Sequence, residues 1–116
     1  MLRTTSMPSY SKNEVVLVRY PFSDLVSTKV RPAVIVNALH TSQDVLIVPL
    51  TSKTTGLLAG EFVLTDWKGA GLNVETAAKR GIFTIHERLV LRRVGRLVTK
   101  DAEKLAVSLR DWLGLQ

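Results

Sequence analysis

Arginine and hydroxyl side chains lie at the ends of two apolar segments and could together bind a phosphate. Arg31 comes immediately before Pro32 at the start of one segment, and Thr51 and Ser52 follow Pro49 at the end of the other. A guanidinium can donate two parallel hydrogen bonds to phosphate oxygens, and hydroxyls beside it can donate more. If the segments are neighbouring strands, these groups meet at one edge of a small sheet.

Positive charge is concentrated in the second half of the chain. The sequence holds 16 Lys and Arg against 10 Asp and Glu, a net charge of +6. Between positions 79 and 96 the single acidic residue is Glu87, and the basic residues are Lys79, Arg80, Arg88, Arg92, Arg93 and Arg96. Such a cluster favours nucleic acid or an acidic protein as partner. A solvated strand face is the alternative.

Composition excludes several classes of protein. The chain has no cysteine, which excludes disulfides, zinc–thiolate sites and cysteine nucleophiles. No apolar stretch approaches the ~18 residues of a membrane span, and the N-terminus lacks the apolar segment of a secretory signal. We therefore expect no membrane association and a cytoplasmic protein. We expect a flexible tail over residues 1–12 and a single domain over 13–116.

Short runs rich in β-branched residues predict strands, separated by proline, glycine and polar turns. The predicted strands are 15–18, 32–36, 45–48, 61–64, 82–85 and 89–98. Gly95 indicates a bend or bulge within the last of them.

The apolar period changes after position 98 and predicts one C-terminal helix. The apolar residues at helical spacing are Ala102, Leu105, Ala106, Leu109, Trp112 and Leu113. Thr99 is the expected N-cap and Gly114 the expected C-cap. Many short strands and one terminal helix predict a mainly β fold, with a small, strongly bent sheet or barrel.

Several motifs, taken in order, resemble the PemK/MazF toxin family over roughly residues 14–115. They are VVLV (15–18), YPFSD (20–24), KVRPAVIV (29–36), IVPLTS (47–52), WKGAGL (67–72) and RRVGRL (92–97). The C-terminal helix ending in Trp112, Leu113 and Gly114 also fits the pattern. The specificity of the resemblance lies in the ordered set of motifs.

The resemblance implies an SH3-like barrel that pairs as a homodimer and serves as the toxin of a type II toxin–antitoxin system. It implies a metal-independent endoribonuclease that needs no cofactor. Such an enzyme cleaves single-stranded RNA, with mRNA the expected class, at short sequences and so inhibits translation. The 2′-hydroxyl attacks the adjacent phosphate and the 5′-oxygen leaves. An acidic antitoxin protein binds the toxin and blocks its RNA groove.

The same resemblance assigns catalytic roles to individual residues. Arg31 matches the catalytic arginine, and the following proline restricts it to extended backbone angles. Thr51 matches the catalytic threonine and, with Ser52, is expected to stabilise the transition state as a donor. Of the two histidines, His40 and His86, the second is the better candidate for the base, because histidine titrates near neutral pH.

Further residues are expected to contact RNA. Phe22 could stack on a base, although it could equally belong to the core, and lysines could contact phosphates. The RNA-binding candidates are Phe22, Ser23, Thr28, Lys29, Lys53 and Arg80.

Two departures from the family pattern keep other functions open. Thr76 stands where the family often has a serine, and Arg80 where it commonly has an aspartate. A catalytically silent SH3-like module that binds nucleic acid or protein is one alternative. A toxin of the same fold that poisons DNA gyrase is another. The Arg31 and Thr51 motifs favour the ribonuclease.

Overall fold

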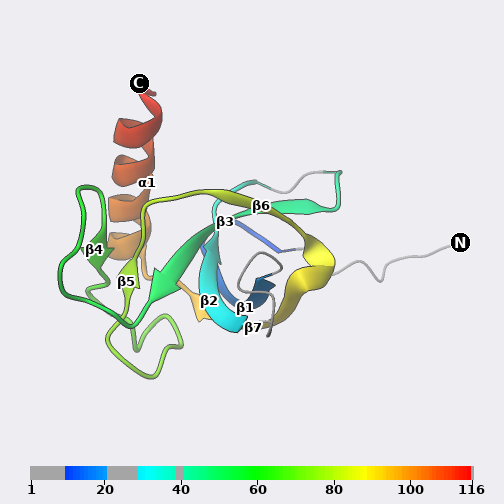
Figure 1. The fold of residues 1–116 in the computed structure, drawn as a ribbon, viewed down its shortest axis with the longest axis horizontal. Helices are drawn as coiled ribbons and strands as arrows, with labels where there is room; N and C mark the ends of the chain where they lie inside the picture. The colour runs from blue at the N-terminus through cyan, green and yellow to red at the C-terminus, as the bar shows by residue number, and fades with distance from the viewer. Residues whose placement is uncertain (1–9, 21–28, 39–40, 116) are drawn as a thin grey trace, which may run out of the picture.

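The computed structural model describes residues 10–20, 29–38 and 41–115. Figure 1 shows the strands first along this described chain and one long helix at its end. The elements are β1 (Glu14–Tyr20), β2 (Lys29–Ile35), β3 (Asp44–Thr51), β4 (Phe62–Val63), β5 (Ala77–Ala78), β6 (Phe83–His86), the 3₁₀ helix η1 (Glu87–Leu89), β7 (Val90–Arg96) and α1 (Thr99–Leu113). No helix in this part of the chain is long and apolar enough to cross a membrane.

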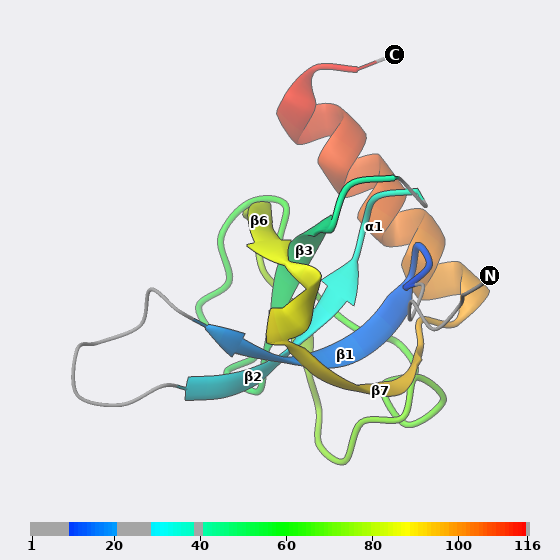
Figure 2. The same cartoon turned by 90° about the vertical axis from the view of Figure 1, so that its right-hand side faces the viewer.

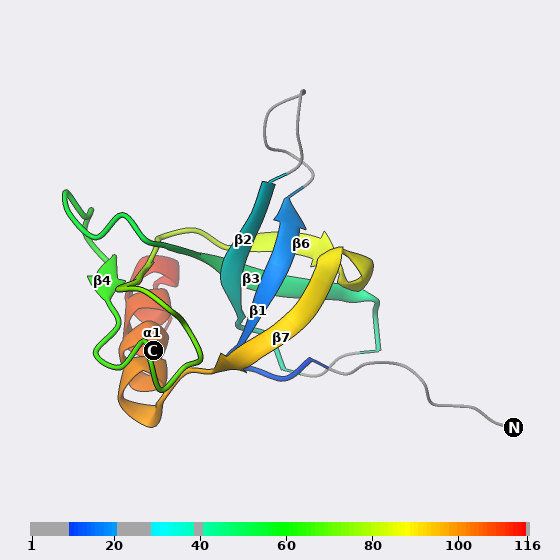
Figure 3. The same ribbon diagram turned by 90° about the horizontal axis from the view of Figure 1, so that it is seen from below.

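The strands form one antiparallel sheet in the order β4-β5-β3-β2-β1-β7, and β6 pairs with β3 beside β5. In Figure 3 β2, β1 and β7 cross in front of β3 and β6, so the sheet is strongly bent. The described strands β4 and β7 end the order without pairing with each other. The expected mainly β fold with a C-terminal helix is confirmed, with an open rather than closed barrel.

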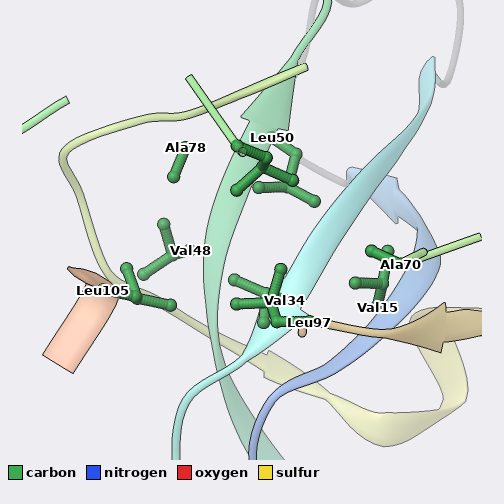
Figure 4. Packing of buried hydrophobic residues seen from close by; sticks show 9 residues of the cluster. Val15, Val34, Val48, Leu50, Ala70, Ala78, Leu97 and Leu105 are labelled. Carbon is green, nitrogen blue, oxygen red and sulfur yellow. The ribbon is translucent and has the colours of Figure 1, made fainter. Parts of the chain in front are cut away.

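The central strands are apolar on both faces, which explains their continuous hydrophobic runs. Alternate residues contribute to two separate clusters, with Val34 and Val48 in one and Ile35 and Ile47 in the other. Figure 4 shows the first cluster, where Leu105 of α1 packs with side chains of the sheet. In Figure 2 α1 accordingly lies behind the sheet. These two clusters fix the faces of β2 and β3, and therefore the strand ends that carry the candidate site.

The ends of α1 differ in how far they match the sequence prediction. Gly114 is the C-cap, with φ of 71°, and its N–H donates to the carbonyls of Arg110 and Asp111. The prediction of Thr99 as the N-cap is wrong, because Thr99 is the first residue of the helix. The N-cap is Val98, whose side chain makes no capping hydrogen bond.

Asp101 links the first turn of α1 to the preceding loop. Its carboxylate is buried and accepts hydrogen bonds from the backbone N–H of Thr65 at 2.9 Å, the Thr65 hydroxyl at 2.8 Å and the N–H of Asp66 at 3.1 Å. An acid in a first turn also interacts favourably with the helix dipole. The carboxylate thus stabilises the start of the helix and holds the 65–66 loop against it.

A bulge lies in β7 where the sequence indicated one. Val15 pairs with Gly95 but Val16 pairs with Arg93, which leaves Val94 as the extra residue. The last predicted strand, 89–98, is shorter in the structure, because Leu89 ends η1 and Leu97 follows β7.

Two arginines of the basic cluster hold the first residue of β1 and the chain that precedes it. Arg93 donates from Nε to the Glu14 carboxylate at 2.7 Å, and its guanidinium lies 4.6 Å from the centre of the Tyr10 ring. Arg96 donates to the Ser11 hydroxyl at 2.6 Å and to the Lys12 carbonyl at 2.8 Å. Of the tail predicted over 1–12, residues 1–9 lie outside the described residues.

The Glu14–Arg93 pair predicts a loss of stability in acid. Burial acts to raise the pKa of Glu14, but hydrogen bonds from Ser11 and Arg93 and the Arg93 charge outweigh it and hold the pKa below its usual value. The stabilisation is therefore complete above the unfolded pKa of about 4.5 and is lost as the pH falls through the folded value. Glu14→Gln should cost about 1 kcal/mol at pH 7, because Arg93 is partly exposed.

Denaturant unfolding from pH 7 to pH 3 would measure this loss. The variant should show a smaller decline in unfolding free energy than the wild type over the acid range. Equal declines in the two proteins would assign the acid sensitivity to other carboxylates.

Candidate active site

The strand register brings Arg31 and Thr51 to the same edge of the sheet. In the β2–β3 ladder Ala33 pairs with Pro49. Arg31 of β2 and Thr51 of β3 each lie two residues beyond this pair, toward the same edge of the sheet. The two segments are thus neighbouring strands, and the cation and hydroxyl that the sequence singled out lie toward the same end of the pair.

Both side chains line one pocket of about 400 Å³. The described residues that line it are Tyr20, Lys29, Arg31, Pro49, Leu50, Thr51, Lys79, Arg80 and Phe83. Four of these side chains are cationic and none is a carboxylate. A concave surface lined by charges of one sign concentrates the field and attracts a ligand of the opposite sign. The pocket is therefore suited to an anion.

Two of these cations, Lys79 and Arg80, lie where the strand pairing along β3 is interrupted beside Pro49. The β3–β5 ladder ends at Ala78, and β6 begins at Phe83. Between them the N–H of Lys79 still donates to the Pro49 carbonyl at 2.9 Å, but proline has no N–H to return. Adjacent side chains of a regular strand face opposite sides of the sheet. Residues 79 and 80 lie outside the regular strand pairing, and the side chains of both Lys79 and Arg80 line the pocket.

Arg80 is held in place by the loop that precedes β4. Its Nη1 donates to the Ala59 carbonyl at 3.2 Å, and its backbone N–H donates to the Glu61 carboxylate at 3.1 Å. The same carboxylate accepts from the Leu58 N–H at 2.8 Å. The Leu58 bond is the largest of the interactions that hold the pKa of Glu61 below its usual value, so this acceptor stays ionised at neutral pH.

Arg31 and Thr51 present donors in the pocket. The Arg31 Nη1 bonds the carbonyl of Val30 at 3.1 Å, which holds the exposed guanidinium against its own strand. The Thr51 hydroxyl accepts from the backbone N–H of Lys53 at 3.1 Å, as in a Ser/Thr turn. Because this oxygen already accepts, its hydrogen can be directed at an anion.

The other predicted residues near Thr51 divide into two groups. Lys29 lines the pocket, at the first position of β2. Ser52 and Lys53 lie in the exposed turn after β3 and are not among the lining residues. That turn is linked to Glu75 by a hydrogen bond of 2.9 Å from the Thr54 hydroxyl.

His86 lies away from this pocket. It pairs with Asp44 at the first residue of β3, whereas Thr51 is the last. At ~3.3 Å per residue, the two ends of β3 are roughly 23 Å apart. The His86 Nδ1 accepts from the Arg88 N–H at 3.0 Å, and its Nε2 lies 3.1 Å from the Gln43 side-chain oxygen. These contacts cap η1 and hold the ring at the far end of the strand.

Three predicted RNA contacts, Phe22, Ser23 and Thr28, lie outside the described residues, as does His40. Conversely, five lining residues were not predicted: Tyr20, Pro49, Leu50, Lys79 and Phe83. Lys79 opens the basic cluster of the sequence, which was an available signal. Phe83, with 38 % of its surface exposed, reads in the sequence as an ordinary strand residue.

Tyr20 is unsuited to act as a base. Its hydroxyl oxygen is buried, and this burial raises the pKa of Tyr20 to about 12, against the opposing effect of the Arg31 charge. The phenol is therefore protonated at neutral pH. Tyr20 supplies an aromatic wall next to Arg31.

Comparisons with known proteins agree with this fold. Residues 11–113 match the profile of the family described as "PemK-like, MazF-like toxin of type II toxin-antitoxin system". Among curated proteins no sequence matches the chain.

Solved structures similar to this fold include the Mycobacterium tuberculosis toxin MazF-mt6, with 20 % identity, a TM-score of 0.70 and coverage of 89 % of this chain and 98 % of that one. An endoribonuclease in complex with its cognate antitoxin, from a mycobacterial species, has 18 % identity, a TM-score of 0.70 and coverage of 91 % and 96 %. The MazE–MazF structure from Deinococcus radiodurans has 14 % identity, a TM-score of 0.74 and coverage of 91 % and 97 %. At these identities the structural likeness concerns the fold.

Proposed function

This chain belongs to the PemK-like, MazF-like toxins of type II toxin–antitoxin systems, and we propose that it is a metal-independent endoribonuclease that cleaves single-stranded RNA at short sequences. The observation that carries the proposal is the pocket that Arg31 and Thr51 line together with three other cations. mRNA is the proposed class of substrate, and inhibition of translation the proposed consequence.

The proposed reaction is an internal phosphoryl transfer. The 2′-oxygen of one nucleotide attacks the adjacent phosphorus, and the bond from phosphorus to the 5′-oxygen breaks. The products are a 2′,3′-cyclic phosphate and a 5′-hydroxyl. One proton leaves the 2′-hydroxyl and one is delivered to the 5′-oxygen, so the reaction consumes no other reagent.

Arg31 and Thr51 act on the charge that develops in this transition state. The Arg31 guanidinium clamps two phosphate oxygens, and the Thr51 hydroxyl donates to one of them. In this proposal Arg31 also donates toward the leaving oxygen. The proposal gives His86 no part in proton transfer, because its ring caps η1 at the other end of β3.

Charge and exposed apolar surface also support the proposed partners. A cation-lined pocket attracts an acidic antitoxin for the same reason that it attracts RNA. The last turn of α1 exposes Trp112 and Leu113, and Leu115 follows it, with 49 %, 52 % and 61 % of their surfaces accessible. Such a patch favours a protein contact, and a second copy of this chain is the proposed occupant.

Incubation of the purified chain with a long unstructured RNA in EDTA tests the function. We expect discrete fragments that carry 2′,3′-cyclic phosphate or 3′-phosphate ends, because the reaction requires no metal. The fragment ends would also identify the sequence that is cleaved. Intact RNA across several substrates would refute the ribonuclease, and RNA retardation without cleavage would indicate a silent binding module.

A further inference from the structure

The cationic pocket contains more positive charge than one phosphate needs. A phosphodiester carries one negative charge, and Arg31 with Thr51 already supplies donors to its oxygens. Lys79 and Arg80 add two cations on the next stretch of chain. The volume of about 400 Å³ lies within the range that holds a small organic ligand. The pocket is large enough for more than the reacting phosphate.

Arg80 is built as an anion-binding group. Its guanidinium donates to the neutral Ala59 carbonyl and makes no salt bridge with another of the described residues. The Glu61 carboxylate instead takes the backbone N–H of Arg80. The guanidinium is therefore oriented by a neutral acceptor, and its charge interacts with Glu61 without a salt bridge between the two side chains.

The loop that orients Arg80 is itself anchored. The Ser108 hydroxyl of α1 donates to the Gly60 carbonyl at 2.7 Å, and the Glu61 carboxylate accepts from Leu58 across the same loop. A donor held in place in advance loses less entropy when a ligand binds. This arrangement favours a fixed subsite at Arg80.

We propose that Arg80, with Lys79 beside it, forms a second phosphate subsite next to Arg31 and Thr51, so that the pocket binds an RNA strand by two successive phosphates. This inference rests on the proposed function, because it takes RNA as the ligand. The phosphate adjacent to the reacting one occupies the Arg80 subsite. A strand with a single phosphate leaves that subsite empty and binds more weakly.

Binding of uncleavable probes tests the subsite without cleavage. The first probe is the 2′-deoxythymidine trinucleotide, which has two phosphates and no 2′-hydroxyl. The second is the same trinucleotide with one phosphate replaced by a neutral methylphosphonate. Wild-type protein should bind the first about tenfold more tightly, since a charge-assisted bond is lost in the second. Arg80→Ala should reduce this ratio to near one.

Arg110→Ala is the matched control, because it removes an exposed arginine of α1 that does not line this pocket. It should keep the tenfold ratio. Arg80→Gln, which retains a hydrogen-bonding side chain, replaces the alanine variant if that protein folds poorly. Equal binding of the two probes by wild type, or an unchanged ratio in the Arg80 variants, would overturn the subsite. Failure of the ribonuclease proposal shows separately, as uncut RNA in EDTA.

Discussion

An Arg31→Ala variant is expected to cleave RNA about 10²–10³-fold more slowly than the wild type, because loss of one preorganised donor to a developing anion has an effect of this size. The side chain is exposed and its described hydrogen bond goes to its own strand. The unfolding free energy should therefore change by less than about 0.5 kcal/mol. Single-turnover cleavage of the RNA identified in the EDTA assay, together with denaturant unfolding, measures both quantities.

Two further variants separate the role of Arg31 from general charge. Arg110→Ala removes the same charge from α1 and should leave the rate almost unchanged. Arg31→Lys keeps the charge but loses the planar pair of donors, so it should recover only part of the activity. An Arg31→Ala protein that cleaves at the wild-type rate, or that is unfolded, would remove Arg31 from the proposed mechanism.

The central strands were predictable because each carries its own signal. β-branched runs predicted β1 and β2, and the helical period predicted α1, to within a few residues of their ends. The third strand continues beyond its predicted end through Pro49, because that proline lies where β5 and β6 leave a gap in the ladder. The two alanines of β5 carry no strand signal, and their pairing with β3 and β4 depends on distant residues.

The residues of the candidate site likewise divide into those in local motifs and those placed by long-range strand pairing. Arg31 and Thr51 were predicted because each stands in a local motif, and both line one pocket beyond the end of the β2–β3 ladder. The position of His86 depended on which end of β3 pairs with β6, which no local pattern specifies. The approach of Lys79 and Arg80 to the pocket depended on the gap beside Pro49. Sequence therefore predicted the groups within motifs better than those placed by long-range pairing.

A close contact between two backbone segments predicts the largest loss of stability. At Gly95 an added Cβ would lie 2.7 Å from the carbonyl carbon of Ala70 and closer still to its oxygen. At Gly71 an added Cβ would lie 3.0 Å from the carbonyl carbon of Val94. The turn before Leu72 and the bulge of β7 therefore approach each other through glycines, and Ala70 is fully buried in the cluster that α1 covers.

Gly95→Ala is accordingly expected to lower the unfolding free energy by about 3 kcal/mol, the upper part of the range for overpacking, because a backbone carbonyl rather than a flexible side chain must move. Gly56→Ala is the matched control. Its φ of 67° strains an alanine, but nothing lies within 4 Å of the added Cβ, so it should cost only about 1 kcal/mol. Denaturant unfolding of both variants separates space from backbone strain. Equal losses would mean that the two segments yield easily and that the contact does not fix the bulge.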